Sequence, residues 1–163
     1  MMTIIACVDR NWGIGCDGDL LFDIPQDMEH FKKQTARKTV VMGRRTFDSL
    51  RVRPLPNRRN IVLTKNRSFE FNGVEVAHSI SELLALTKNE EREVFVIGGS
   101  QVYARLLKYC DKAIITRVDA AINADSYITS FDDLPEWKVL SVSERFEHKG
   151  LFYNFTTYIK DVH

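Results

Sequence analysis

The sequence lacks the features that mark several classes of protein. Its 23 lysines and arginines are matched by 22 aspartates and glutamates, so no basic surplus points to nucleic acid. No apolar run approaches the length of a membrane span. The three cysteines, Cys7, Cys16 and Cys110, are scattered and odd in number, which fits reduced thiols better than a disulfide framework. We therefore expect a cytoplasmic protein with no nucleic-acid or membrane partner.

Several catalytic motifs are missing as well. The four histidines lie near no serine or cysteine nucleophile motif and show no metal-ligand spacing, which disfavours covalent hydrolysis and zinc chemistry. We expect no metal. The pattern G-x-x-x-x-G-K-[ST] is absent, which disfavours phosphoryl transfer through a P-loop. No repeat and no linker rich in Pro, Gly or Ser divides the chain, so we expect residues 1–163 to form one domain.

The chain does contain alternating strand-like and helix-like segments. Apolar, β-branched runs predict strands at 3–8, 39–43, 60–64, 74–77, 94–97 and 113–118. Helical patterns begin at Pro25, Arg44, Ser79 (a possible capping box with Glu82) and Ser100. Residues 9–23 are predicted to be a long mobile loop, and residues 138–147 and 151–159 an antiparallel hairpin around 148–150. The fold class expected is α/β: a mixed, mostly parallel sheet with helices on both faces and an antiparallel C-terminal hairpin.

Three of the predicted strands end in turns that favour anions. One runs through Gly43 into Arg44-Arg45-Thr46, the second reaches Thr64-Lys65, and the third ends at Gly98-Gly99-Ser100. In an open α/β sheet, ligands bind beyond the carboxyl ends of the strands, where helix N-termini and free N–H groups face anions. The pattern suggests a large phosphorylated cofactor, although a solvated basic turn and a tight strand-to-helix turn are the plainer alternatives. The glycine pair is not the G-x-G-x-x-G fingerprint of the common dinucleotide fold.

Two further segments carry candidate functional groups. Helical geometry places Asp27 beside Ile24, Met28 and Phe31, on the apolar face of its helix. A carboxylate there needs a partner and suits protonation or hydrogen bonding of a polar substrate, while a first-turn acid that complements the helix dipole is the alternative. Residues 51–59 form a basic loop stiffened by two prolines, whose arginines could bind a carboxylate or simply face solvent.

These segments together resemble dihydrofolate reductase. Ile5 to Gly15 and Ile24 to Lys32 resemble the first strand, mobile loop and first helix of that family. The run from Val41 to Leu50 resembles its cofactor helix, Arg53 to Arg58 its proline loop, and Val96 to Tyr103 its glycine pair. The resemblance runs in order through nearly the whole chain. It implies NADPH-dependent reduction of 7,8-dihydrofolate to 5,6,7,8-tetrahydrofolate, by hydride transfer to C6 with protonation at N5.

The resemblance also implies roles for individual residues. Asp27 would bind the pterin and promote protonation, with Thr116 in support and Phe22 beside it. Arg58 would pair with the α-carboxylate of the substrate's glutamate tail. The other substrate-binding residues implied are Ile5, Cys7, Met28, Phe31, Leu50, Leu55, Ile97 and Tyr103. The cofactor-binding residues implied are Ala6, Ile14, Gly15, Gly43, Arg44, Arg45, Thr46, Leu63, Thr64, Lys65, Ile97, Gly98, Gly99, Ser100, Gln101, Val102 and Tyr103.

Three positions depart from the family pattern. Phe22 stands where the family usually has tryptophan, Gln101 where some bacterial members have arginine, and Ile128-Thr129 where Phe-Pro is usual. We expect a monomer that antifolate inhibitors would bind. The alternatives are a related reductase that acts on another pyrimidine and a non-catalytic nucleotide- or folate-binding module. The position of Asp27 and of the Arg58 loop argues against the first, and the complete cofactor site argues against the second.

Overall fold

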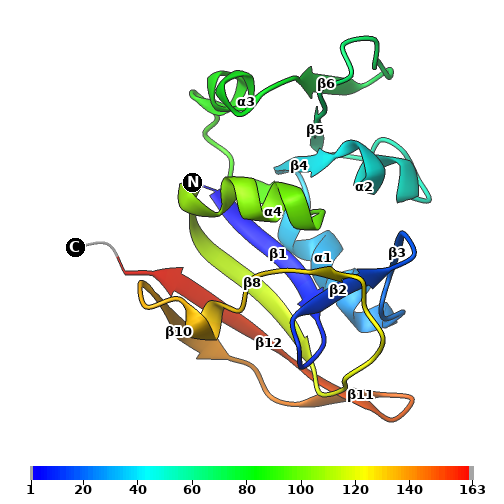
Figure 1. The fold of residues 1–163 in the computed structure, drawn as a ribbon, viewed down its shortest axis with the longest axis vertical. Helices are drawn as coiled ribbons and strands as arrows, with labels where there is room; N and C mark the ends of the chain where they lie inside the picture. Colours follow the sequence, from blue (N-terminus) through cyan, green and yellow to red (C-terminus); the bar gives the residue numbers. More distant parts are fainter. Residues whose placement is uncertain (1, 162–163) are drawn as a thin grey trace.

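A nine-stranded sheet forms the centre of the protein in the computed structural model, which describes residues 2–161 (Figure 1). Its strands follow the order β10-β12-β8-β1-β7-β4-β5-β6, and β11 pairs with β12 beyond that path. The five pairings from β8 to β6 are parallel, whereas β12 runs antiparallel to β8, β10 and β11. These strands are β1 (Met2–Val8), β4 (Thr39–Gly43), β5 (Arg59–Leu63), β6 (Val74–Ala77), β7 (Val94–Val96), β8 (Cys110–Val118), β10 (Trp137–Val142), β11 (Phe146–His148) and β12 (Leu151–Lys160).

Helices cover both faces of this sheet, as the sequence predicts. They are α1 (Pro25–Thr35), α2 (Arg44–Ser49), α3 (Ile80–Thr87) and α4 (Ser100–Leu106), with short 3-10 turns η1 (Leu107–Tyr109) and η2 (Phe131–Asp133). Successive residues of a strand point to opposite faces. Accordingly, Val40 and Met42 join Phe47 of α2 in one apolar cluster, while Val41 joins Leu106 of α4 in another. No helix among residues 2–161 is both long and apolar enough to cross a membrane.

The helix starts follow local signals in the sequence. Pro25 occupies the first turn of α1, where its missing N–H costs nothing. At α3 the Ser79 hydroxyl accepts a hydrogen bond from Glu82 N at 3.1 Å. The Glu82 carboxylate accepts from His78 N, not from Ser79 N, so only half of the predicted capping box forms.

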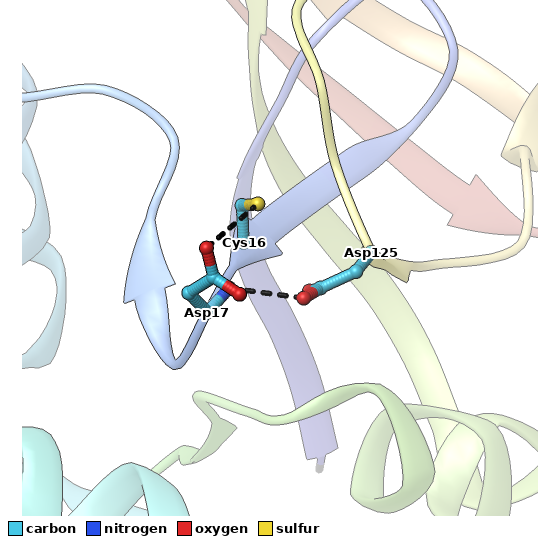
Figure 2. Close-up of side chains that lie close together, drawn as sticks. All are labelled: Cys16, Asp17 and Asp125. Atoms are coloured by element: carbon cyan, nitrogen blue, oxygen red, sulfur yellow. Dashed lines mark hydrogen bonds between the residues drawn. The ribbon is translucent and has the colours of Figure 1, made fainter.

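Residues 9–23 are not loop throughout, which corrects the sequence prediction. β2 (Gly13–Cys16) pairs with β3 (Asp19–Leu20) and with β9 (Ser126–Tyr127) in a small antiparallel sheet. Asp125 forms two hydrogen bonds with this segment. Its carboxylate accepts from Asp17 N at 3.0 Å, and its own N–H donates to Gly15 O at 3.0 Å. Figure 2 shows Asp125 beside Asp17 and Cys16, whose thiol lies 3.8 Å from the Asp17 carboxylate. The hairpin is therefore tied to a segment more than 100 residues away in sequence.

The structure confirms the turn of the predicted C-terminal hairpin, but the prediction of its outer strand is wrong. His148 pairs with Leu151 across the turn at 149–150. The predicted strand 138–147 is instead two strands, β10 and β11, with residues 143–145 outside either. The register with β12 also shifts inside β10, between Val139 and Ser141, and such an irregularity bends a strand.

Candidate active site

The candidate site lies at the edge of the sheet where the parallel strands end. Gly43 closes β4, Thr64 follows β5, Ile97 follows β7, and Cys7 lies near the end of β1. Because these strands are parallel, their carboxyl ends meet at one edge. Residues predicted from four separate motifs therefore share one edge.

Asp27 reaches that edge from the first turn of α1. Thr116 of β8 donates a hydrogen bond from Oγ1 to Asp27 Oδ1 at 2.5 Å. Burial raises the pKa of the Asp27 carboxyl above its usual range, and the Thr116 hydrogen bond opposes part of that rise. A carboxyl group with this environment can hold or release a proton closer to neutral pH than an exposed one.

A row of side chains from three neighbouring strands forms the wall under α1. Cys7 of β1 is in register with Thr116 of β8, which in turn faces Phe155 of β12. Burial raises the pKa of the Cys7 thiol well above its usual range, and the nearby Asp27 raises it further. The thiol therefore stays protonated and acts as a small apolar group with a weak donor directed at Asp27.

Apolar side chains enclose the remainder of this corner. Phe22 and Cys7 pack with Ile24, the N-cap residue of α1, in one cluster, while Tyr103 and the half-buried Ala6 and Ile14 belong to another. The remaining predicted walls meet in a third cluster around buried Ile5: they are Phe31, Leu50, Leu55 and Ile97. Met28 is the exception. It is 45% exposed and belongs to none of the apolar clusters formed by residues 2–161. Helical periodicity, which puts Met28 on the apolar face of α1, therefore predicts more burial than the structure shows.

Arg58 lies in the proline loop with its guanidinium already oriented. Its Nε donates to Pro56 O at 2.9 Å and its Nη1 donates to Thr35 Oγ1 at 3.0 Å. Partial burial lowers the pKa of this guanidinium, and no carboxylate within residues 2–161 forms an ion pair with it. The group is fixed in direction and retains donors for an anion.

The glycine pair makes a close contact with the start of α2. Gly43 N donates to Gly98 O at 2.9 Å, and the Gly98–Gly99 peptide bond is cis. Gly98 has a φ of +136°, and a Cβ there would lie 3.2 Å from Thr46 Oγ1. Glycine is needed at this position both for the backbone angle and for the close approach. Tyr103 packs behind the pair and donates from its buried hydroxyl to Ile5 O at 2.8 Å.

Both helices beside the glycine pair begin without a side-chain cap. Gly43 caps α2 and Gly99 caps α4, and neither can accept a hydrogen bond through a side chain. Within the described chain, the first N–H groups of these helices are thus available to a bound group. Ser100, Gln101 and Val102 form the first turn of α4, with Gln101 exposed and Val102 buried.

The predicted cations differ in what they contact. Arg44 Nε lies 3.1 Å from both carboxylate oxygens of Asp48, and its guanidinium stacks over Phe69 at 4.3 Å. Arg45 and Lys65 are exposed. The remaining predicted cofactor residues at the β5 end are Leu63, which is buried in the core, and Thr64, whose N–H donates to Ala77 O at 2.9 Å. The i,i+4 spacing of Arg44 and Asp48 is a signal in the sequence that could have predicted their pairing.

Two of the departures from the family pattern find local explanations. Ile128 is buried and donates from its N–H to Trp12 O at 3.0 Å, so this position still ties its loop to the segment before β2. Phe22 fills its place as an apolar group.

His30, which no motif singles out, lies one helical turn from Asp27 and stacks on Phe155.

A hollow of about 570 Å³ lies elsewhere on the protein. Its lining includes Lys108, Tyr109, Trp137 and Lys160. Lys160 pairs with Trp137 at the end of the sheet where β8 begins, whereas Thr116 lies near the end where β8 finishes. This hollow is therefore separate from the edge that holds Asp27.

Comparisons with known proteins agree with this geometry. A sequence profile described as dihydrofolate reductase matches residues 1–160. The chain is 38% identical to dihydrofolate reductase of Bacillus subtilis (strain 168) over 162 residues, covering 98% of this chain and 95% of that protein. It is 40% identical to dihydrofolate reductase of Mycobacterium tuberculosis (strain CDC 1551 / Oshkosh), covering 97% of each.

A solved structure shows the same fold. Dihydrofolate reductase from Enterococcus faecalis, complexed with NADP(H) and RAB-propyl, superposes with a TM-score of 0.91 at 31% identity, covering 99% of this chain and 97% of that one. The profile, the relatives and this structure agree over nearly the full length of the chain. The chain belongs to the dihydrofolate reductase family, the enzymes that reduce 7,8-dihydrofolate to tetrahydrofolate with NADPH.

Proposed function

We propose that Asp27 binds the pterin and promotes protonation at N5 while the hydride is delivered to C6. The observation that carries this role is the half-buried Asp27 carboxylate, which accepts a hydrogen bond from Thr116 in an otherwise apolar corner. Burial raises the pKa of Asp27, so the carboxyl can share a proton with a polar ring near neutral pH. Thr116 fixes the orientation of that carboxyl.

The apolar walls keep water away from the reacting ring. Ile5, Phe31 and Ile97 pack in one apolar cluster that would line the pocket beside Asp27, and Phe22 would add bulk without a hydrogen-bond donor. Exclusion of water strengthens each electrostatic contact inside the pocket and holds the reactants in one geometry. The chain thus supplies orientation, a dry pocket and one carboxylate.

Arg58 would hold the far end of the substrate. Two of its five N–H donors are occupied by Thr35 and Pro56, which leaves the others for a carboxylate. A guanidinium recognises a carboxylate through paired hydrogen bonds, and the glutamate tail of dihydrofolate offers one. This contact lies away from the reacting ring and serves binding.

The residues around the glycine pair fit NADPH. Gly98 leaves space beside Thr46 that a Cβ would occupy, and the uncapped starts of α2 and α4 offer N–H groups to a pyrophosphate. Arg44, Arg45, Thr64 and Lys65 would hold the adenosine 2′-phosphate and its surroundings. When bound, NADPH supplies the hydride.

We expect the protein to be a cytoplasmic monomer with reduced cysteines. All three cysteines are unpaired, which fits a reducing cytoplasm. Light scattering on a sizing column would test the expected monomer. Antifolate inhibitors would compete with dihydrofolate for the pocket at Asp27.

The Thr116 hydroxyl offers a test of the Asp27 assignment. Thr116→Val removes the donor, so the Asp27 pKa should rise further and the pH profile of NADPH consumption with dihydrofolate should move to higher pH. Thr116→Ser keeps a hydroxyl and is the matched control, with a profile close to that of the parent protein. An unchanged profile in Thr116→Val would remove Asp27 from the proton step.

A further inference from the structure

His30 has a buried polar atom that the reaction described above does not use. Its Nε2 is shielded from solvent and forms no hydrogen bond with any residue in the described part of the chain. The imidazole stacks on the Phe155 ring with centroids 3.9 Å apart and planes inclined by 19°. A buried polar atom without a partner costs free energy, so the position asks for a compensating role.

The position of His30 places it beside the proposed reacting carboxylate. His30 follows Asp27 by three residues in α1, a spacing that puts Cβ atoms roughly 5–6 Å apart on one helix face. Phe155 of β12 pairs directly with Thr116 of β8, and paired residues project to the same face of a sheet. Asp27 therefore contacts Thr116 while His30 contacts the adjoining Phe155, and the two titratable groups lie side by side.

The two groups also influence each other electrostatically. Burial lowers the pKa of the His30 imidazole, and the negative charge of Asp27 opposes that fall. Burial raises the pKa of Asp27, and a positive charge on His30 adds to the opposition from Thr116. Burial thus moves the two pKa values toward each other. Because the charge on each group also changes the pKa of the other, their titrations are coupled.

We propose that His30 is a positioning residue for the reacting carboxylate, a charge partner held on Phe155 that governs how readily Asp27 takes up a proton. This inference rests on the role proposed for Asp27. With a neutral imidazole, Thr116 is the main support of the Asp27 anion and the carboxyl protonates readily. With a cationic imidazole, the anion is favoured and proton uptake by Asp27 is opposed.

The other titratable groups around this corner do not replace His30. From β1 and β12 the groups facing Asp27 are the Cys7 thiol and the Tyr153 phenol, and burial raises the pKa of each. Both stay neutral while an imidazole titrates. Within α1, Lys33 is also one turn from His30, but it is exposed, so solvent screens its charge.

Paired titrations test the coupling directly. The imidazole resonances of His30 are followed by NMR against pH in the ligand-free protein and in Asp27→Asn. We expect the midpoint of His30 to move to lower pH in Asp27→Asn, because the neighbouring negative charge is lost. His148, the last residue of β11, is the internal reference, and its resonances should behave alike in both proteins.

The reverse experiment uses His30→Phe, which keeps an aromatic ring on Phe155 and removes the charge. The carboxyl ¹³C resonance of Asp27 should then titrate at higher pH, by the same shift, since coupling between two sites is reciprocal. An unchanged midpoint in either titration overturns the proposal, and the Asp27→Asn arm decides if His30→Phe does not fold. Both titrations are made without substrate, so they test the coupling independently of catalysis. If the two groups are coupled but Asp27→Asn keeps full activity, the catalytic role of Asp27 is refuted and the coupling with His30 stands.

Discussion

Replacement of Arg58 by leucine should weaken substrate binding and spare the chemical step. The Arg58 guanidinium is held by Thr35 and Pro56, which leaves three of its five donors for a carboxylate. Two charge-assisted hydrogen bonds to that carboxylate, discounted for partial exposure, are worth about 3 kcal/mol together. A loss of that size raises the KM for dihydrofolate roughly a hundredfold. Because the contact is equal in ground and transition states, kcat should change little.

The assay is steady-state NADPH consumption with two substrates. One is dihydrofolate and the other is a reduced pterin that lacks the glutamate tail. Arg58→Leu should raise the KM for the first and leave the kinetics of the second nearly unchanged. Arg51→Leu, an exposed position in the same basic loop, is the matched control and should leave both within about twofold. Equal losses on both substrates, or a fall confined to kcat, would refute the pairing.

Three other substitutions have defined outcomes. Arg44→Ala should raise the KM for NADPH far more than that for NADH, because only NADPH carries the 2′-phosphate, and equal effects would place Arg44 elsewhere. Phe22→Trp should change dihydrofolate affinity or the pH profile by a modest factor, whereas a parent protein inactive until tryptophan is installed would indicate a binding module. The Glu90 side chain is 7% exposed, and its hydrogen bonds with Arg92, Thr39 and Arg59 lower its pKa. Because its pKa is lowered in the folded protein, ionised Glu90 stabilises the fold at neutral pH, and this stabilisation is lost in acid. Urea denaturation of Glu90→Gln should therefore show a free energy of unfolding lower by about 3 kcal/mol at pH 7, and the difference should shrink as the pH falls.

The elements that sequence predicts well are those whose signals are local. Apolar β-branched runs gave β1, β4 and β5, and Pro25 marked the start of α1. The short strands β2, β3 and β9 escaped because they are glycine-rich or only two residues long, and β2 pairs with a strand more than 100 residues away. The division between β10 and β11 falls at residues 143–145, and the hydrophobic pattern of the sequence does not mark it.

The site residues differ in the same way, between those marked by local motifs and those that depend on strand register. Asp27, Arg58 and the glycine pair lie in contiguous motifs, so their positions could be predicted from the sequence. The environment of Asp27 could not, because it depends on which residues of β8 and β12 lie under α1. Thr116 opposite Phe155 is a fact of strand register, and this register sets Phe155 against His30, one helical turn from the carboxylate. Met28 shows the reverse error, since a periodic apolar position can still be exposed.

The role proposed for the Asp27 carboxylate is to support the proton step. Its most direct test is single-turnover hydride transfer in Asp27→Asn, followed by the loss of NADPH absorbance with dihydrofolate at neutral and at acidic pH. The variant should fold and bind NADPH, yet transfer hydride at pH 7 more slowly by about a hundredfold or more, with partial recovery in acid where the substrate arrives protonated. Hydride transfer near the parent rate at pH 7 would contradict the claim.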